Sequence, residues 1–160
     1  MKKSTGQVVL RILFLLYGLV MLWLLFGQRI DRSIFHLRLS GDGIPYREMM
    51  EKNINLIPFA TVKLFLRLLQ NSTDIALLRH AVINLVGNVV MFVPLGFFLP
   101  QIYGKKSNFL KYILFVAAII LLVEVLQLIT LLGSCDIDDL ILNLLGASFG
   151  YLINVLRKKK

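Results

Sequence analysis

The sequence is poor in cysteine, histidine and acidic residues, and each scarcity excludes a kind of site. With Cys135 as the single cysteine among 160 residues, there is no internal disulfide and no zinc site built from several cysteines. The two histidines, His36 and His80, lie between or at the edge of the long apolar runs, so no Ser/His/Asp set falls within those runs.

Charge is also scarce, and this excludes an ordinary soluble domain. Charged residues make up 17% of the chain and hydrophobic residues 58%. A soluble domain has about a quarter of its residues charged, and its apolar residues form stripes and not blocks. We therefore expect one integral membrane domain over residues 1–160. The net charge of +9 comes from Lys and Arg beside apolar runs, so the bilayer is the expected partner and nucleic acid is not.

Four runs are long enough to cross a bilayer, which takes about 20 mostly apolar residues. They cover residues 8–26, 81–103, 109–132 and 137–156. The first is longer than the apolar core of a signal peptide and has no small-x-small cleavage site after it, so we interpret it as an uncleaved anchor. The expected fold is an all-α integral membrane protein with four transmembrane helices.

The connection 27–80 contains a fifth apolar stretch, residues 54–69. It is short and is interrupted by Lys63 and Arg67. A fifth span would also reverse the direction of every later one. We therefore expect an interfacial or re-entrant helix on the outer face of the membrane.

Basic residues without acidic neighbours set the expected orientation. They occur before or early in the first run, after the second run and after the fourth run: Lys2, Lys3, Arg11, Lys105, Lys106, Lys111, Arg157, Lys158, Lys159 and Lys160. An even number of spans puts all of them on one side, which the positive-inside rule makes cytoplasmic. Both termini are then cytoplasmic, and the loop 27–80 is outside.

Seven polar residues lie within or at the rim of the last three runs, where polar groups are costly and indicate function. At 1.5 Å per residue, about the rise of a helix, all seven fall in the outer half of the bilayer. Within each run they are three, four or seven residues apart and so share a helix face. We expect them to line an outward-facing polar pocket: Asn84, Asn88, Glu124, Gln127, Asp136, Asp139 and Asn143.

Two further features concern the fourth run. Asp138 falls off the polar face and is expected to point to solvent or to a lipid headgroup. Gly146 and Gly150 form a small-xxx-small pattern, which lets a neighbouring helix approach closely.

Glu124 carries the strongest signal of the seven, because a carboxylate within a span costs about 2.5–3.5 kcal/mol. It must be protonated, paired or hydrated. The amides, a metal ion, or an outer-loop base such as Arg47, Arg67 or Arg79 are its candidate partners, and the sequence leaves the choice open. Neither a cofactor nor a set of metal ligands is predicted.

Four pieces in order, from Asn55 to Tyr151, resemble the VanZ-like family. They are Asn55-Leu-Ile-Pro58-Phe59; Asn84-x-x-x-Asn88-x-x-x-Phe92-x-Pro94-x-Gly96; Glu124-x-x-Gln127; and Asp136-Ile-Asp138-Asp139-x-x-x-Asn143-x-x-Gly146. The resemblance implies a small bacterial membrane protein of a family whose founding member confers low-level teicoplanin resistance. It supports Asn88, Glu124, Gln127, Asp136, Asp139 and Asn143 as pocket-lining residues, and Pro58, Pro94 and Gly96 as shape-setting ones.

The resemblance and the polar residues together favour a binding or protective role. Teicoplanin carries a lipid tail and acts on cell-wall precursors at the outer leaflet of the bacterial cell membrane. A polar pocket within that membrane is in the right place to bind the lipidated drug or a lipid-linked precursor. The carboxylates and amides suit amines, hydroxyls and amides on such a ligand.

Two other functions stay open. An enzyme acting on envelope lipids or wall precursors could use Glu124, Asp136 and Asp139 as acid and base, or to hold Mg²⁺ or Ca²⁺. Transport or proton relay through Glu124 is the third reading, but the inner halves of the spans are nearly free of polar groups. An oligomer is also left open.

Overall fold

The computed structural model describes residues 5–27, 30, 45–103 and 108–157. Its elements are α1 (Thr5–Leu25), α3 (Tyr46–Lys52), β1 (Ile54–Asn55), α4 (Ala60–Asn71), α5 (Ile75–Tyr103), α6 (Phe109–Ile129), β2 (Cys135–Asp136) and α7 (Ile137–Arg157). In this described part, four helices (α1, α5, α6 and α7) are long and apolar enough to cross a membrane. The protein is thus an all-α, multi-pass membrane protein, which confirms the predicted fold class.

The helix boundaries differ most from prediction at α5. This helix begins at Ile75, six residues before the predicted start, and continues through Pro94 and Pro100. Asp74 explains the early start, because its Oδ1 accepts hydrogen bonds from the backbone N–H groups of Ala76 and Leu77 and so caps the helix. Its 29 residues span about 43 Å, which exceeds the roughly 30 Å of a bilayer's hydrocarbon core.

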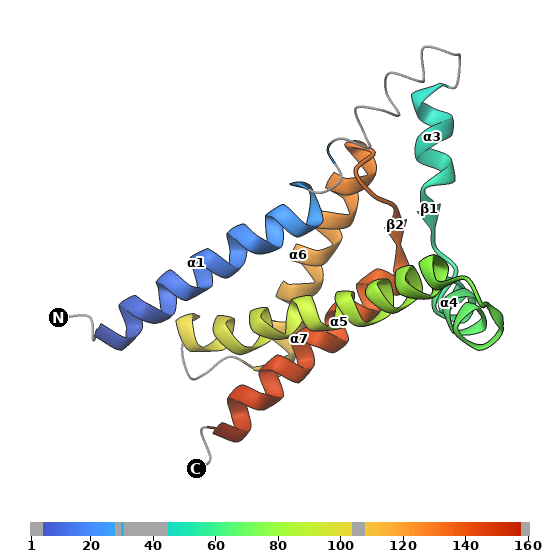
Figure 1. Ribbon diagram of the computed structural model, residues 1–160. Helices are drawn as coiled ribbons and strands as arrows, with labels where there is room; N and C mark the ends of the chain where they lie inside the picture. Colours follow the sequence, from blue (N-terminus) through green and yellow to red (C-terminus); the bar gives the residue numbers. More distant parts are fainter. Residues whose placement is uncertain (1–4, 28–29, 31–44, 104–107, 158–160) are drawn as a thin grey trace.

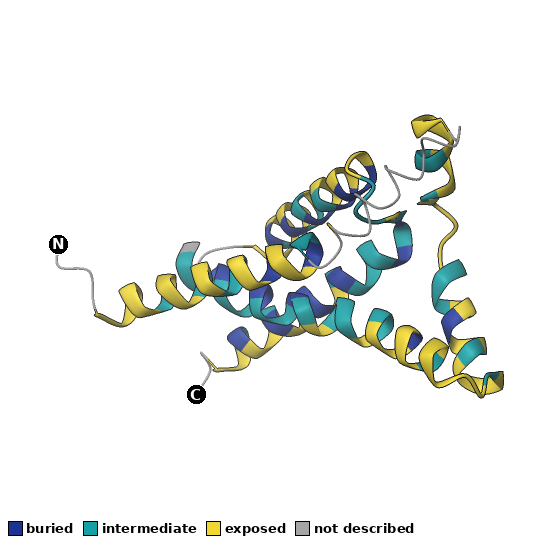
Figure 2. Ribbon diagram, turned by 45° about the horizontal axis from the view of Figure 1, so that its top comes forward, coloured by how far each residue is buried: buried dark blue, intermediate teal, exposed yellow. Residues whose placement is uncertain are grey.

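The described ends of the long helices define two ends of the bundle (Figure 1). The start of α1, the end of α5, the start of α6 and the end of α7 lie toward one side. The ends of α1 and α6 and the start of α7 lie toward the other side, together with β1 and β2; we call this the polar end. Exposed residues cover the outer faces of all four long helices, and buried residues face inward (Figure 2). This pattern suits a lipid surround, since lipid tails accept apolar side chains.

Glycine brings α5 and α7 into backbone contact. A Cβ on Gly146 would lie 1.9 Å from the Val89 carbonyl oxygen, and one on Gly150 the same distance from that of Val93. From the other side, a Cβ on Gly96 would lie 2.0 Å from the carbonyl oxygen of Ala147. The contacts advance by four residues on both helices, so α5 and α7 run parallel, as the second and fourth spans of one chain must.

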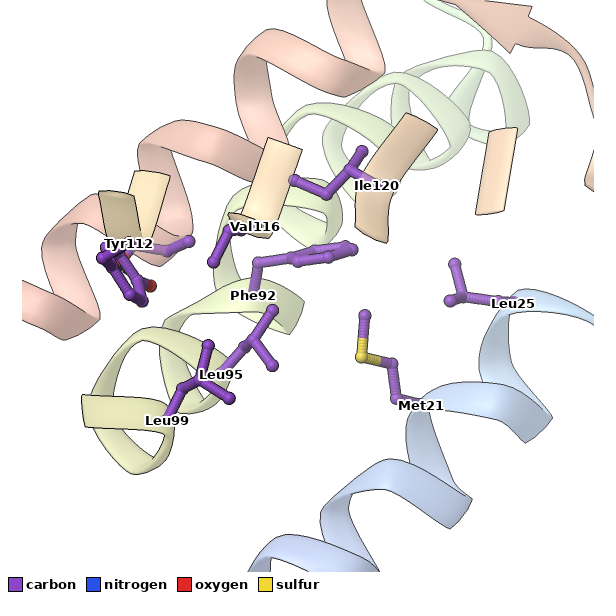
Figure 3. Close-up of a cluster of buried hydrophobic side chains, with 9 residues drawn as sticks. Met21, Leu25, Phe92, Leu95, Leu99, Tyr112, Val116 and Ile120 are labelled. Atoms are coloured by element: carbon purple, nitrogen blue, oxygen red, sulfur yellow. Dashed lines mark hydrogen bonds between the residues drawn. The ribbon is translucent and has the colours of Figure 1, made fainter. Parts of the chain in front are cut away.

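A cluster of apolar side chains joins α1 and α6 to this pair (Figure 3). Phe92 lies at its centre, fully buried, between the α6 residues Val116 and Ile120 and the α1 residue Met21. Among the four long helices, α1 has the smallest buried share, 11% of its most apolar window. It is therefore the helix most surrounded by lipid.

The short strands and α4 were less well anticipated. Ile54 and Asn55 of β1 pair in parallel with Cys135 and Asp136 of β2, although about 80 residues separate them in the sequence. The predicted interfacial or re-entrant segment 54–69 divides into β1, a turn and the helix α4. Two-residue strands carry too little periodicity for a sequence pattern to detect them.

We expect Gly146→Val to destabilise the protein more than Gly18→Val. A Cβ at Gly146 would collide with a backbone carbonyl that cannot move aside, whereas a Cβ at Gly18 meets nothing within 4 Å. Overpacking of this kind costs about 1–3 kcal/mol or more. Thermal unfolding of both variants in detergent measures the difference, and equal midpoints would contradict the packing described for α5 and α7.

Candidate functional site

Asp138 corrects a prediction. It was expected to face solvent or a headgroup, but its side chain is 0% exposed. Its carboxylate accepts hydrogen bonds from the backbone N–H groups of Phe59 and Val62, which are the N-cap and N3 positions of α4. The helical phase of Asp138 placed it outside the polar face of its own helix, yet its partners belong to α4, which is remote in sequence. A buried carboxylate is stabilised here by two amides and by the positive end of the α4 dipole.

The turn that leads into α4 depends on this contact. Phe59 adopts a left-handed backbone conformation, with φ of 63°. That conformation costs a non-glycine residue roughly 1–2 kcal/mol. The bond from its N–H to Asp138 helps to hold it. The turn includes Pro58, one of the positions that the family resemblance gives as shape-setting.

Asp136 joins β1 and α4 to the start of α7. Its Oδ2 accepts hydrogen bonds from the Asn55 side-chain amide, at 3.2 Å, and from the Thr61 hydroxyl. Its Oδ1 accepts from the backbone N–H of Asp138 at 2.8 Å. Its own N–H donates to Glu124 Oε2 at 3.3 Å. The Asp136 and Asp138 carboxylates are therefore bonded to neutral donors of the protein itself.

The partner question for Glu124 receives a partial answer. Its side chain is 3% exposed and accepts the backbone N–H of Asp136 described above. Arg47, one of the bases proposed for it, forms an exposed ion pair with Glu51 on α3. Among the described residues, no group of three or more His, Cys, Asp and Glu residues has the arrangement of a metal site.

Gln127 has a different role from the carboxylates. Its side-chain amide donates a hydrogen bond to the carbonyl of Leu25, the last residue of α1, at 3.0 Å. In the same way, the Tyr46 hydroxyl donates to the carbonyl of Ile129, the last residue of α6. Both side chains satisfy helix-end carbonyls that lack partners in their own helix.

Asn84 and Asn88 lie elsewhere, on the face of α5 that looks toward α1. They line a groove of about 450 Å³ between these helices. The α1 wall is Tyr17, Val20, Met21 and Leu24, and the α5 wall is His80, Ile83, Asn84, Gly87, Asn88, Val90, Met91 and Pro94. A mostly apolar cavity of this size with a few polar groups is typical of a small-molecule site.

The groove is apolar at one end and has polar residues at the other. At the apolar end, the Tyr17 hydroxyl donates a hydrogen bond to the Met91 carbonyl at 2.8 Å, which ties the two walls together. At the other end His80, Asn84 and Asn88 follow one another at single-turn spacing on α5. These polar side chains therefore form a stripe along α5 that ends at Asn88. The α5 residues beyond it in the groove, Val90, Met91 and Pro94, are apolar.

Two of the amides differ in their bonding. Asn88 Nδ2 donates to Asp139 Oδ1, which links the groove to the start of α7. Asn84 Oδ1 is buried without a hydrogen-bond partner among the described residues. Buried polar atoms almost always have partners. Asn84 Oδ1 is thus an acceptor with unused hydrogen-bonding capacity in the groove wall.

The seven residues predicted as one pocket therefore occupy three settings. Asn84 and Asn88 line the groove, and Asp139 bonds to Asn88 from behind. The Glu124 and Asp136 pair and the Gln127 amide satisfy backbone and side-chain groups at the polar end. Asn143 is buried, 3% exposed, on the α7 face that includes Gly146. Sequence reasoning missed Thr61, Tyr17 and His80, because single polar or aromatic residues carry no periodic signal.

Comparison with known proteins gives one match. A model of the VanZ/LLP1 family matches residues 12–158, nearly the whole chain, and confirms the resemblance found from the motifs. No curated protein and no solved structure matches the chain significantly.

We expect Asp138→Ala to release α4 from α7. The change removes two hydrogen bonds to the α4 N-terminus, and loss of such a cap costs about 0.5–2 kcal/mol before the penalty for unpaired buried amides. Hydrogen exchange at the amides of Phe59–Val62 should accelerate. Asp74→Ala is the matched control, since Asp74 caps α5 by the same kind of bond from an exposed position. Unchanged exchange at Phe59–Val62 in Asp138→Ala would rule out the cap.

Cys135 gives a prediction about reactivity. It lies between α6 and α7, outside the spans, and burial raises the pKa of its thiol, as do the nearby Glu124 and Asp136 carboxylates. Less thiolate is then present near neutral pH than for a free cysteine, so alkylation should be slow and accelerate as the pH rises. Glu124→Gln should lower this pKa and speed the reaction.

The same thiol tests the orientation. A membrane-impermeant maleimide applied to intact cells should label Cys135, given the expected outward position of the polar end. Labelling only after the cells are opened would place this end in the cytoplasm.

Proposed function

Because the chain belongs to the VanZ/LLP1 family, we propose that it contributes to low-level teicoplanin resistance by binding the lipidated drug or a lipid-linked cell-wall precursor. The ligand lies in the groove between α1 and α5, at the outer leaflet of the bacterial cell membrane. Binding there keeps the drug from its target, either by holding the drug or by shielding the precursor.

The make-up of the groove is the observation that supports this function. An amphiphile needs an apolar wall for its chain and hydrogen-bonding groups for its head. The groove provides Val20, Met21 and Val90 for the first and the stripe of His80 and the asparagine amides for the second. Its volume of about 450 Å³ falls within the roughly 300–1,000 Å³ of ligand sites.

The alternative is an enzyme acting on the same molecules through Glu124, Asp136 and Asp139. The bonding at the polar end favours a structural role for Asp136, because its carboxylate already accepts bonds from Asn55, Thr61 and the backbone. A general base needs access to substrate, and Asp136 is only 7% exposed. A modified lipid or wall precursor found by mass spectrometry only in cells with the protein would favour the enzyme instead.

The test of binding is to fill the groove. Gly87 lies in its wall, and the nearest side-chain atom to a Cβ there is 4.0 Å away. Gly87→Phe should therefore occupy the cavity without distorting α5, and the minimum inhibitory concentration of teicoplanin should fall to that of cells lacking the protein.

Gly18→Phe is the matched control, since it adds the same ring to a helix where a Cβ meets open space. This variant should keep full resistance at equal expression. Full resistance in Gly87→Phe, with the protein inserted at the normal level, would contradict binding in the groove.

A further inference from the structure

The end of the groove at His80, which we call its mouth, has an exposed positive charge beside it. Arg79 and His80 are exposed at that end of α5. Arg79 precedes the groove residue Ile83 by four residues and so lies one turn above it on the same face. From Asn53 to Tyr103 the sequence has a single acidic residue, Asp74. Its side chain caps α5, as described above. Lys63, Arg67 and Arg79 outnumber it, so these elements carry a net positive charge.

Asp139 contacts the groove wall, but it does so through Asn88, which lies two turns below His80 and so below the mouth. Asp136 and Asp138 are buried and accept hydrogen bonds from Asn55, Thr61 and the α4 backbone. Asp136 and Asp138 therefore face the protein interior and are already bonded. A cationic head group at the mouth would meet Arg79, which repels it, and an anionic one would be attracted.

The mouth also lies at the right depth for a phosphate. A hydrocarbon core takes about 20 helical residues. Counted back from the Tyr103 end of α5, these reach to about Ile83. Arg79 and His80 are then at the level of the lipid headgroups, and Asn84 is at the edge of the hydrocarbon. Below them the groove continues to Pro94, inside the apolar layer.

We propose that the groove binds an amphiphile with a phosphate or diphosphate head, held at Arg79 and His80, and a hydrocarbon chain that runs down toward Tyr17 and Pro94. Arg79 supplies charge and hydrogen bonds to the phosphate oxygens, and His80 supplies a further hydrogen bond. This inference rests on the proposed function, and it narrows the ligand to an anionic class.

The test compares two probes that differ only in the head. The full-length protein is placed in nanodiscs of phosphatidylcholine, and dissociation constants are measured for a polyprenyl phosphate and for the polyprenol of the same chain length. The phosphate should bind more tightly. Arg79→Gln should weaken phosphate binding by about fivefold or more and leave polyprenol binding unchanged.

Arg67→Gln is the matched control. It removes the same charge from an exposed residue of α4, but Arg67 lies on the face opposite Phe65, the side chain that packs against His80. It should leave phosphate binding nearly unchanged. Equal binding of the two probes, or an equal loss in Arg67→Gln and Arg79→Gln, would overturn the proposal, because the head would then be unrecognised or attracted only by net charge.

Gly87→Phe separates failure of this inference from failure of the proposed function. If it weakens neither probe, the groove is not the ligand site and both ideas fail. The other outcome is that both probes bind the normal protein equally and that Gly87→Phe abolishes the binding of both. The groove is then the ligand site, and only the phosphate inference fails.

Competition by phosphatidylglycerol assigns the source of the phosphate. If phosphatidylglycerol does not displace the polyprenyl phosphate, the proposal is supported and the ligand is a polyprenyl carrier. Equal competition supports the phosphate chemistry with an ordinary anionic bilayer lipid as the occupant.

Discussion

Hydrogen bonds from side chains to the ends of other helices hold the polar end of the bundle together. Asp138 of α7 bonds the N-terminus of α4, and Gln127 of α6 bonds the C-terminus of α1. Tyr46 of α3 does the same for the C-terminus of α6. In water such helix ends could be hydrated, but near lipid an unpaired backbone group is costly and must find a partner within the chain. This constraint explains why elements that are remote in the sequence are hydrogen-bonded to one another at this end.

The constraint also explains what sequence reasoning could and could not predict. Long apolar runs reveal the four spans, and the spacing of Gly146 and Gly150 points to the close approach of a helix, because both signals are local and periodic. The role of Asp138 was not predictable in this way. Its partners, Phe59 and Val62, are almost 80 residues away, and helical phase describes only the neighbours within one helix.

The candidate site shows the same division. Spacing predicted that Asn84 and Asn88 share a face of α5, and both line the groove. Grouping them with Glu124 and Asp136 assumed that polar residues at similar depth face one another. Depth fixes only one coordinate, however. The direction in which each side chain points depends on the rotation of its helix. That rotation is set by packing such as that of Phe92 in the apolar cluster, which the pattern of polar residues does not reveal.

Separation of these roles changes how loss of function at a carboxylate is to be understood. Removal of Asp136 or Asp138 leaves partly buried donors at the start of α4 without their acceptors, and an unpaired buried group costs about 1–3 kcal/mol. Such a variant loses any activity that needs α4 in place, whether or not its carboxylate touches a ligand. Since α4 packs Phe65 against His80 at the groove mouth, with ring centroids 5.7 Å apart, the damage reaches the groove indirectly. Substitutions at Gly87 and Arg79 change the cavity or its mouth without breaking these hydrogen bonds. They therefore test how the ligand is bound, whereas substitutions of the carboxylates test the fold.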